Sequence, residues 1–217
     1  MNDQITPEPI AAVTPINVDI GGWLKAGWQF FVADVMKYVL ASLIFVLVGA
    51  ISCGILAGPM TVGFFKCLLK KARGQNFEYG ELFDGIKTQF VPALLVLLAL
   101  IIPAIILGAV PFVGKTLGTV WQLFAGMIAT YVFFIIAESA VPVQVGALQQ
   151  LAKDVWARVQ PAWVMILVLI VVVALINIAG MLLCCVGLFF TMPIVYMALT
   201  ISYLAIFRDE KPVLPAA

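Results

Sequence analysis

The sequence predicts an all-α, polytopic membrane protein, and three observations carry this prediction. Of its 217 residues, 64% are hydrophobic and only 11% are charged, whereas roughly a quarter of the residues in soluble domains are charged. Six apolar stretches are long enough, or nearly so, to cross about 30 Å of hydrocarbon as helices. Basic residues cluster beside these stretches, as they do on the cytoplasmic side of bacterial inner-membrane proteins.

The clearest unit is a membrane hairpin between Tyr38 and Gly74. Its first span, 38–56, carries no charge and meets the sequence Ala-Gly-Pro at 57–59. Proline is tolerated in the first turn of a helix, so one helix is expected to end near Gly58 and another to start there. The second span, 59–73, is short and ends in the basic residues Lys66, Lys70, Lys71 and Arg73.

Three amphipathic stretches, 21–37, 80–90 and 144–161, are predicted to be helices on the cytoplasmic surface. They would place Trp28, Phe83 and Trp156 near the lipid headgroups. Their apolar faces are Leu24, Trp28, Phe31, Val35 and Tyr38; then Leu82, Phe83, Ile86 and Phe90; then Val145, Leu148, Ala152, Val155 and Val159. Their polar faces are Lys25, Gln29 and Lys37; then Glu81, Asp84 and Lys87; then Gln149, Gln150, Lys153 and Arg158.

The chain therefore has six predicted spans arranged as three hairpins, each preceded by a surface helix. The four later spans are 91–110, 117–137, 162–183 and 187–207. The three units, 20–73, 80–138 and 144–207, have the same orientation in the membrane. Either a true structural repeat or the simplicity of building a membrane protein from helical hairpins accounts for this. Residues 1–19 are predicted to be a disordered cytoplasmic tail, 20–207 a single membrane domain, and 208–217 a second cytoplasmic tail.

The distribution of basic residues predicts that both termini are cytoplasmic. With six spans, Lys115 alone lies outside, and eleven basic residues lie inside, which is the bias that sets orientation. The acidic, proline-bearing N-terminus has no basic region followed by an apolar one, so no cleaved signal peptide is expected. The inside set is Lys25, Lys37, Lys66, Lys70, Lys71, Arg73, Lys87, Lys153, Arg158, Arg208 and Lys211.

Composition also limits the chemistry. The net charge of +1 argues against a nucleic-acid partner. Histidine, the commonest metal ligand and general base, does not occur. No nucleophile, base and orienting group occur together at a plausible spacing. We therefore expect no catalytic residue, no cofactor and no metal site, and we expect that the protein is not an enzyme.

The candidate site residues are small or polar groups within the spans. Gly54 and Gly58 form a small-xxx-small pattern beside Pro59, which favours close helix packing. Lys66 is either an intramembrane functional charge or a lysine that snorkels to the interface. Asn177 is either a gate or ligand group or an amide that hydrogen-bonds a neighbouring helix.

Three cysteines and a few other polar groups are the remaining candidates. Cys53, Cys184 and Cys185 are predicted at the outer face, where a disulfide from Cys53 to either of the others is compatible with an oxidising periplasm. Apart from Asn177, the polar groups within spans are mainly hydroxyls such as Thr130 and Thr200. Glu138 closes the fourth span, where an interfacial carboxylate is ordinary.

The runs GPMTVGFFKCLLKKARGQ, ELFDGIK and GLFFTMPIVYMALTISYLAIF resemble a large group of uncharacterised bacterial six-helix integral membrane proteins. That group is similar to the membrane domain attached to some glycerophosphodiester phosphodiesterases. The resemblance extends from about Gly22 to Phe207, and the phosphodiesterase catalytic domain has no counterpart here. It implies a fold and a compartment, and it hints at envelope or lipid physiology.

We expect an accessory, scaffold or assembly subunit of a membrane complex, or a homo-oligomer, that acts through packing. Its partners would be membrane lipids and either another membrane protein or copies of itself. The alternative is a transporter, channel or lipid-handling protein. Ions and charged solutes usually need polar groups along their path, which this chain largely lacks, so the substrate would be apolar or lipidic.

Overall fold

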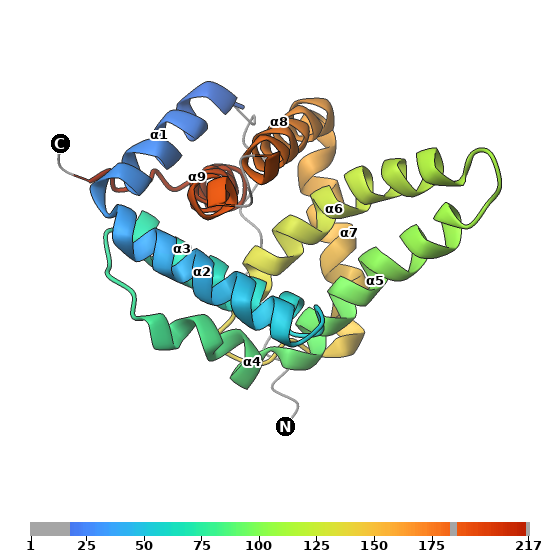
Figure 1. Cartoon of the computed structure of the whole chain (residues 1–217), viewed down its shortest axis with the longest axis horizontal. Helices are drawn as coiled ribbons and strands as arrows, with labels where there is room; N and C mark the ends of the chain where they lie inside the picture. The colour runs from blue at the N-terminus through green and yellow to red at the C-terminus, as the bar shows by residue number, and fades with distance from the viewer. Residues whose placement is uncertain (1–17, 183–185, 216–217) are drawn as a thin grey trace.

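The computed structural model describes residues 18–182 and 186–215, and these residues form helices connected by short turns, with no strand among them (Figure 1). The longer helices are α1 (Ile20–Ala33), α2 (Val35–Ile51), α3 (Ala57–Ala72), α5 (Phe90–Gly108), α6 (Gly114–Glu138), α7 (Leu148–Val159), α8 (Trp163–Leu182) and α9 (Val186–Tyr203). Shorter elements are η1 (Tyr79–Phe83), α4 (Asp84–Thr88), η2 (Val145–Ala147), η3 (Gln160–Ala162) and the π-helical turn η4 (Leu204–Arg208).

Four helical segments of the described chain are long and apolar enough to cross a membrane. They are α5, α6, the segment that contains α8 and the segment that contains α9. A fifth is counted if α1 and α2, which meet at a bend of 100°, are taken as one broken span. The protein is therefore an all-helical chain with four or five candidate spans.

Helix α3 lies at the centre of the bundle and contacts α2, α5, α6 and α9. It has 16 residues, which is about 24 Å of helix and less than the hydrocarbon thickness. Most of those residues are buried, so α3 is matched to its neighbouring helices more than to lipid. Helix α9, which Figure 1 shows nearly end-on, is the second interior helix, whereas α5 and α8 are mainly exposed.

Aromatic side chains fill the contact between α3, α6 and α9. The Phe65 and Phe134 rings stack at 3.9 Å between centroids, and Phe134 stacks on Tyr203 at 5.1 Å. Tyr203 in turn stacks on Phe207 at 5.4 Å. Aromatic pairs of this kind add about 0.5–1.5 kcal/mol each beyond the area that they bury. This stack fixes how the ends of the three helices sit relative to one another.

The predicted spans coincide with helices, but the break in the first hairpin lies earlier than predicted. Helix α2 ends at Ile51, not near Gly58, and a turn over 52–56 follows. Cys53 and Gly54 have positive φ angles of 51° and 84°, which is the left-handed backbone that reverses the chain. Pro59 lies in the first turn of α3, as predicted, where its missing N–H group costs nothing.

The first amphipathic helix forms, but its contact face is rotated from the predicted one. Trp23, Phe30 and Phe31 are buried in α1, whereas Trp28 is 55% exposed. The reason is tertiary, because α1 packs along α9. A Cβ atom on Gly27 would lie 2.5 Å from the Ile194 carbonyl oxygen, so the two backbones approach closely at that point.

Lys87, Gln149, Gln150 and Lys153 are exposed as predicted, but other members of the two polar faces are turned inward. Glu81 and Asp84 form ion pairs with lysines of α3, at 2.8 Å from Lys70 and 2.7 Å from Lys66. Arg158 of α7 is only 5% exposed, and its Nε donates a hydrogen bond to the Ile206 carbonyl. Amphipathic periodicity identified these helices correctly, but it does not distinguish water from a charged neighbour as the partner of a polar face.

Candidate functional site: a charge cluster and a hollow

The ends of α3, α6 and η4 meet at a partly buried carboxylate. Glu138, the last residue of α6, accepts hydrogen bonds on Oε2 from the Tyr203 hydroxyl at 2.6 Å and from Arg208 Nε at 2.7 Å. Its other oxygen, Oε1, accepts a hydrogen bond from Arg73 Nη2. The Glu138 side chain is 17% exposed. One carboxylate therefore joins three helices.

The C-terminal segment contacts the end of α3 beside this carboxylate. Asp209, at φ 54°, turns the chain after η4, and Glu210 then pairs with Arg73 at 2.9 Å. Farther along, the Val213 N–H donates to the Ala72 carbonyl at 2.8 Å, which satisfies an acceptor at the end of α3. The predicted tail is thus bound to α3 through Val213. We call Arg73, Glu138, Tyr203, Arg208 and Glu210 the charge cluster.

The charge cluster has the character of a structural clamp. Burial lowers the pKa of Arg73, but hydrogen bonds to Glu210 and Glu138 outweigh burial and raise that pKa above its ordinary value. Two guanidinium groups face two carboxylates, so their charges cancel. The Tyr203 hydroxyl donates a hydrogen bond to Glu138 and is not available as a base. The sequence placed Glu138 at an interface, but nothing local indicated its three partners.

The residues singled out from the sequence mostly lie at helix contacts. A Cβ atom on Gly58 would meet the Ala93 carbonyl oxygen at 2.6 Å, so α3 and α5 touch there. Gly54 contacts nothing in this way, and its positive φ serves the turn. Gly63, which the sequence did not single out, is tighter still: its Cβ would lie 1.9 Å from the Leu82 carbonyl oxygen.

The two polar candidates have neighbours within the chain. Lys66 pairs with Asp84, and its side chain is 38% exposed. Asn177 of α8 lies 3.5 Å from the Thr191 hydroxyl of α9, at the edge of hydrogen-bonding distance. The structure does not bring Lys66 and Asn177 together with each other or with the charge cluster in any contact among the described residues.

The cysteine hypothesis falls largely outside the described residues. Cys184 and Cys185 are not described, so their pairing with Cys53 stays a prediction. Cys53 is exposed in the turn after α2 and forms no disulfide with another described residue. In the ranges 18–182 and 186–215, no three Cys, Asp or Glu side chains come together as a metal site would require.

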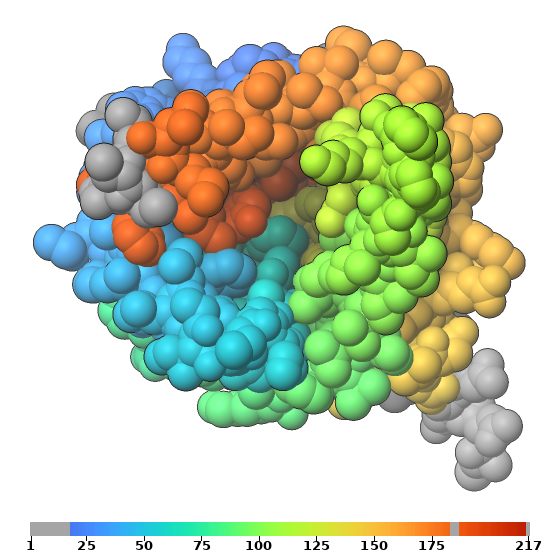
Figure 2. All heavy atoms as spheres, turned by 45° about the vertical axis from the view of Figure 1, so that its right-hand side comes forward, coloured from blue at the N-terminus to red at the C-terminus, as the bar shows by residue number. Residues whose placement is uncertain are grey.

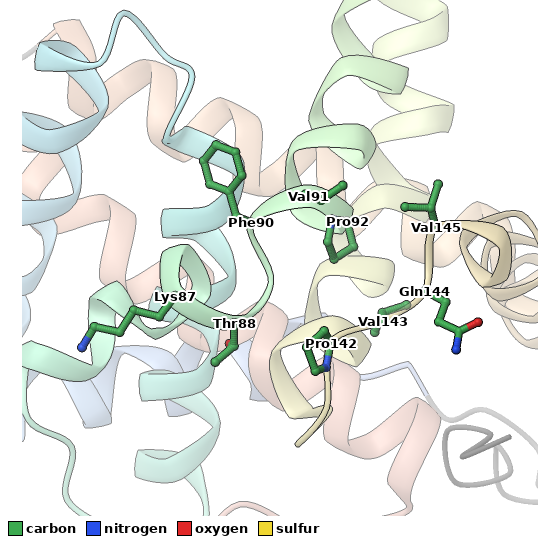
Figure 3. A pocket seen from close by; sticks show the side chains of 9 residues that line it. All are labelled: Lys87, Thr88, Phe90, Val91, Pro92, Pro142, Val143, Gln144 and Val145. Carbon is green, nitrogen blue, oxygen red and sulfur yellow. The ribbon is translucent and has the colours of Figure 1, made fainter. Parts of the chain in front are cut away.

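A shallow groove of about 450 Å³ lies where α4 gives way to α5, beside the segment that follows α6 (Figure 3). Its walls are largely apolar, and Figure 3 shows the Lys87 amine and the Gln144 amide extending away from each other at its two edges. Gln89, which is 2% exposed, holds this region together. Its amide donates to the Val141 carbonyl at 2.9 Å and accepts from the Val143 N–H at 3.0 Å.

A second feature is a hollow on one face of the molecule. Figure 2 shows it between α2 in cyan, the outer parts of α5 and α6 in green, and α9 in orange-red. We call this concave surface the hollow. Exposed apolar side chains on its bordering helices include Leu47, Ile51, Ile101 and Phe190. The α5–α6 hairpin extends beyond the rest of the bundle, as Figure 1 shows.

Helix α6, whose outer part borders the hollow, also carries a polar stripe. Gln122, Gly126 and Thr130 follow one another at intervals of four and share one helix face. On the same face, eleven residues farther on, Phe133 and Ala137 are buried in the bundle. The stripe therefore continues a packed face into open space. Gln122 was not singled out from the sequence, although an amide in the middle of a predicted span was a usable signal.

Comparison of the chain with protein families, with curated proteins and with solved structures finds no match.

Proposed function

We propose that this protein is a non-enzymatic bacterial inner-membrane protein that works by contact between membrane helices. It would serve as an accessory, scaffold or assembly subunit, or as a homo-oligomer, without a cofactor and without a nucleic-acid partner. The single observation that carries the proposal is the hollow beside the protruding α5–α6 hairpin. A hollow bordered by helices with exposed apolar side chains, next to a projecting hairpin, is suited to receive a helix.

The proposal includes six spans arranged as three hairpins. Helices α2 and α3, with 17 and 16 residues, would be the two short spans of the first hairpin. Because α3 is enclosed by other helices, its length does not have to match the bilayer. The proposal also includes the likeness to the membrane domain attached to some glycerophosphodiester phosphodiesterases.

Cytoplasmic termini make a testable topology. We expect an impermeant thiol reagent to label intact cells that carry a single cysteine at position 115 or 184, because both positions would face the periplasm. A single cysteine at position 70 is the matched control, and it should be labelled only after the cells are opened. Labelling at 70 with exclusion from both 115 and 184 would contradict this topology.

The rival function is handling of an apolar or lipidic substrate, and the same hollow favours it as a second candidate. Ions and charged solutes are less suited, because the helices that border the hollow carry many exposed large apolar side chains. The two functions differ in one respect. A contact protein moves nothing across or within the bilayer, whereas a transporter shows substrate-dependent flux.

We therefore expect purified protein in vesicles to give no flux above empty vesicles for fluorescent lipids, apolar dyes or ions. Lys66→Met and Asn177→Leu, which alter the two polar candidates, should leave this baseline unchanged. Flux that either substitution abolishes would overturn the contact proposal and support transport. Flux that neither substitution changes, but that disappears with Gln122→Leu, would also support transport and would locate the path at Gln122.

A further inference from the structure

Gln122 is the most informative residue of the polar stripe, because its amide lies in an apolar helix and is exposed. Among residues 18–182 and 186–215, no side chain or backbone group hydrogen-bonds to it. An amide facing hydrocarbon without a partner is unfavourable, and interhelical hydrogen bonds are its usual remedy in membrane proteins. Within a membrane span, a hydrogen-bonding group from outside the described residues would therefore stabilise Gln122.

The neighbouring residues permit a second helix to come close. A Cβ atom on Gly126 would meet nothing within 4 Å, so the backbone of α6 is open at that point. The Thr130 hydroxyl already donates to the Gly126 carbonyl at 2.8 Å, which leaves its oxygen as an acceptor. Small residues four apart on one face are the usual setting for close helix contact in membranes.

We propose that the stripe formed by Gln122, Gly126 and Thr130 is the contact between two copies of this chain. The inference rests on the proposed function and names the partner. An amide both donates and accepts, so Gln122 of one copy can bond to Gln122 of the other across a two-fold axis. Each copy also carries a protruding hairpin directly beside a hollow, so the α5–α6 hairpin of one copy enters the hollow of the other.

If the hairpin of each copy enters the hollow of the other, one interface accounts for both the hairpin and the hollow. In an isologous dimer the same surface serves both copies, so every chain must present both the projection and the hollow. A different membrane protein would need only the hollow and would leave the hairpin exposed. The second copy is therefore the occupant that the geometry favours.

Disulfide cross-linking in native membranes tests the contact. We would place single cysteines at Gln122 or at Val120 in a full-length chain whose four native cysteines are replaced by alanine. Val120 is 47% exposed at nearly the same depth of α6, but it lies on the opposite helix face. We expect Gln122→Cys to form dimers on mild oxidation and Val120→Cys to form few.

Substitution on the stripe provides a second measurement. Gln122→Leu should weaken self-association in vesicles, measured by energy transfer between labelled copies, by about three- to twentyfold, the range expected for one interhelical hydrogen bond. Gly126→Leu should weaken it at least as much by blocking the approach. Thermal unfolding of both variants should match that of the parent. A Cβ atom at position 126 meets nothing within 4 Å, and the Gln122 side chain is exposed. Val120→Leu is the control and should associate like the parent.

Each outcome decides the inference. Equal cross-linking at Gln122 and Val120, or undiminished association of Gly126→Leu, would show that the stripe is not the contact. A cross-link from Gln122→Cys to a different membrane protein would reject the second copy but keep the contact function. Flux through reconstituted protein would reject the contact function itself, whatever the cross-links show.

Discussion

Replacing Glu138 by alanine is expected to destabilise the protein by about 3–5 kcal/mol, as the loss of one partner from a buried charge pair typically does. The carboxylate accepts hydrogen bonds from Arg73, Arg208 and Tyr203, and its side chain is 17% exposed. Without it, two partly buried guanidinium groups face each other and lose an acceptor. The measurement is the free energy of unfolding in mixed micelles, from denaturing-detergent titration.

Three further variants separate charge from packing. Glu138→Gln keeps an acceptor for Tyr203 and should lose less stability than Glu138→Ala. Glu210→Gln should cost less than about 1 kcal/mol, because the Glu210 side chain is 42% exposed and ion pairs of that kind contribute little. Glu78→Ala, at an exposed carboxylate outside the cluster, should change stability by about 0.5 kcal/mol or less. If Glu138→Ala had the same free energy of unfolding as Glu78→Ala, the charge cluster would not contribute to stability.

Replacing Gly63 by alanine should be the most damaging small substitution, at about 1–3 kcal/mol or more. The added Cβ would lie 1.9 Å from the Leu82 carbonyl oxygen. That oxygen belongs to the backbone, so no side-chain rotation relieves the clash, and η1 must move away from α3. This movement would also draw Asp84 from Lys66. Unfolding free energy and the rate of proteolysis between α3 and α5 would report both effects.

Gly49→Ala is the matched control for this substitution. Gly49 is a helical glycine of α2 whose added Cβ would meet nothing within 4 Å. Alanine there should therefore stabilise the helix, by as much as about 1 kcal/mol, through the reduced entropy of the unfolded chain. The two variants should change stability in opposite directions. Destabilisation of both by the same amount would show that the contact with Leu82 is not the cause.

The sequence by itself was sufficient to locate the helices. Hydropathy and amphipathic periodicity depend on residues within a turn or two of one another, so they place α5, α6, α8 and α9 within a few residues of their observed bounds. Pro59 marked the first turn of α3 for the same local reason. The end of α2 was placed several residues too late because 52–56 contains no proline, and the turn depends on positive φ angles at Cys53 and Gly54.

Only the tertiary structure decided what each polar face meets. Burial of Trp23 and exposure of Trp28 follow from the packing of α1 on α9, which periodicity does not encode. Arg158, Glu81 and Asp84 were expected in water because a helical pattern separates polar from apolar faces without naming the neighbour. Glu138 meets Arg73 and Arg208 across 65 and 70 residues of sequence. Such contacts exist only once the helices have packed, so the charge cluster and the open stripe at Gln122 emerge from the fold.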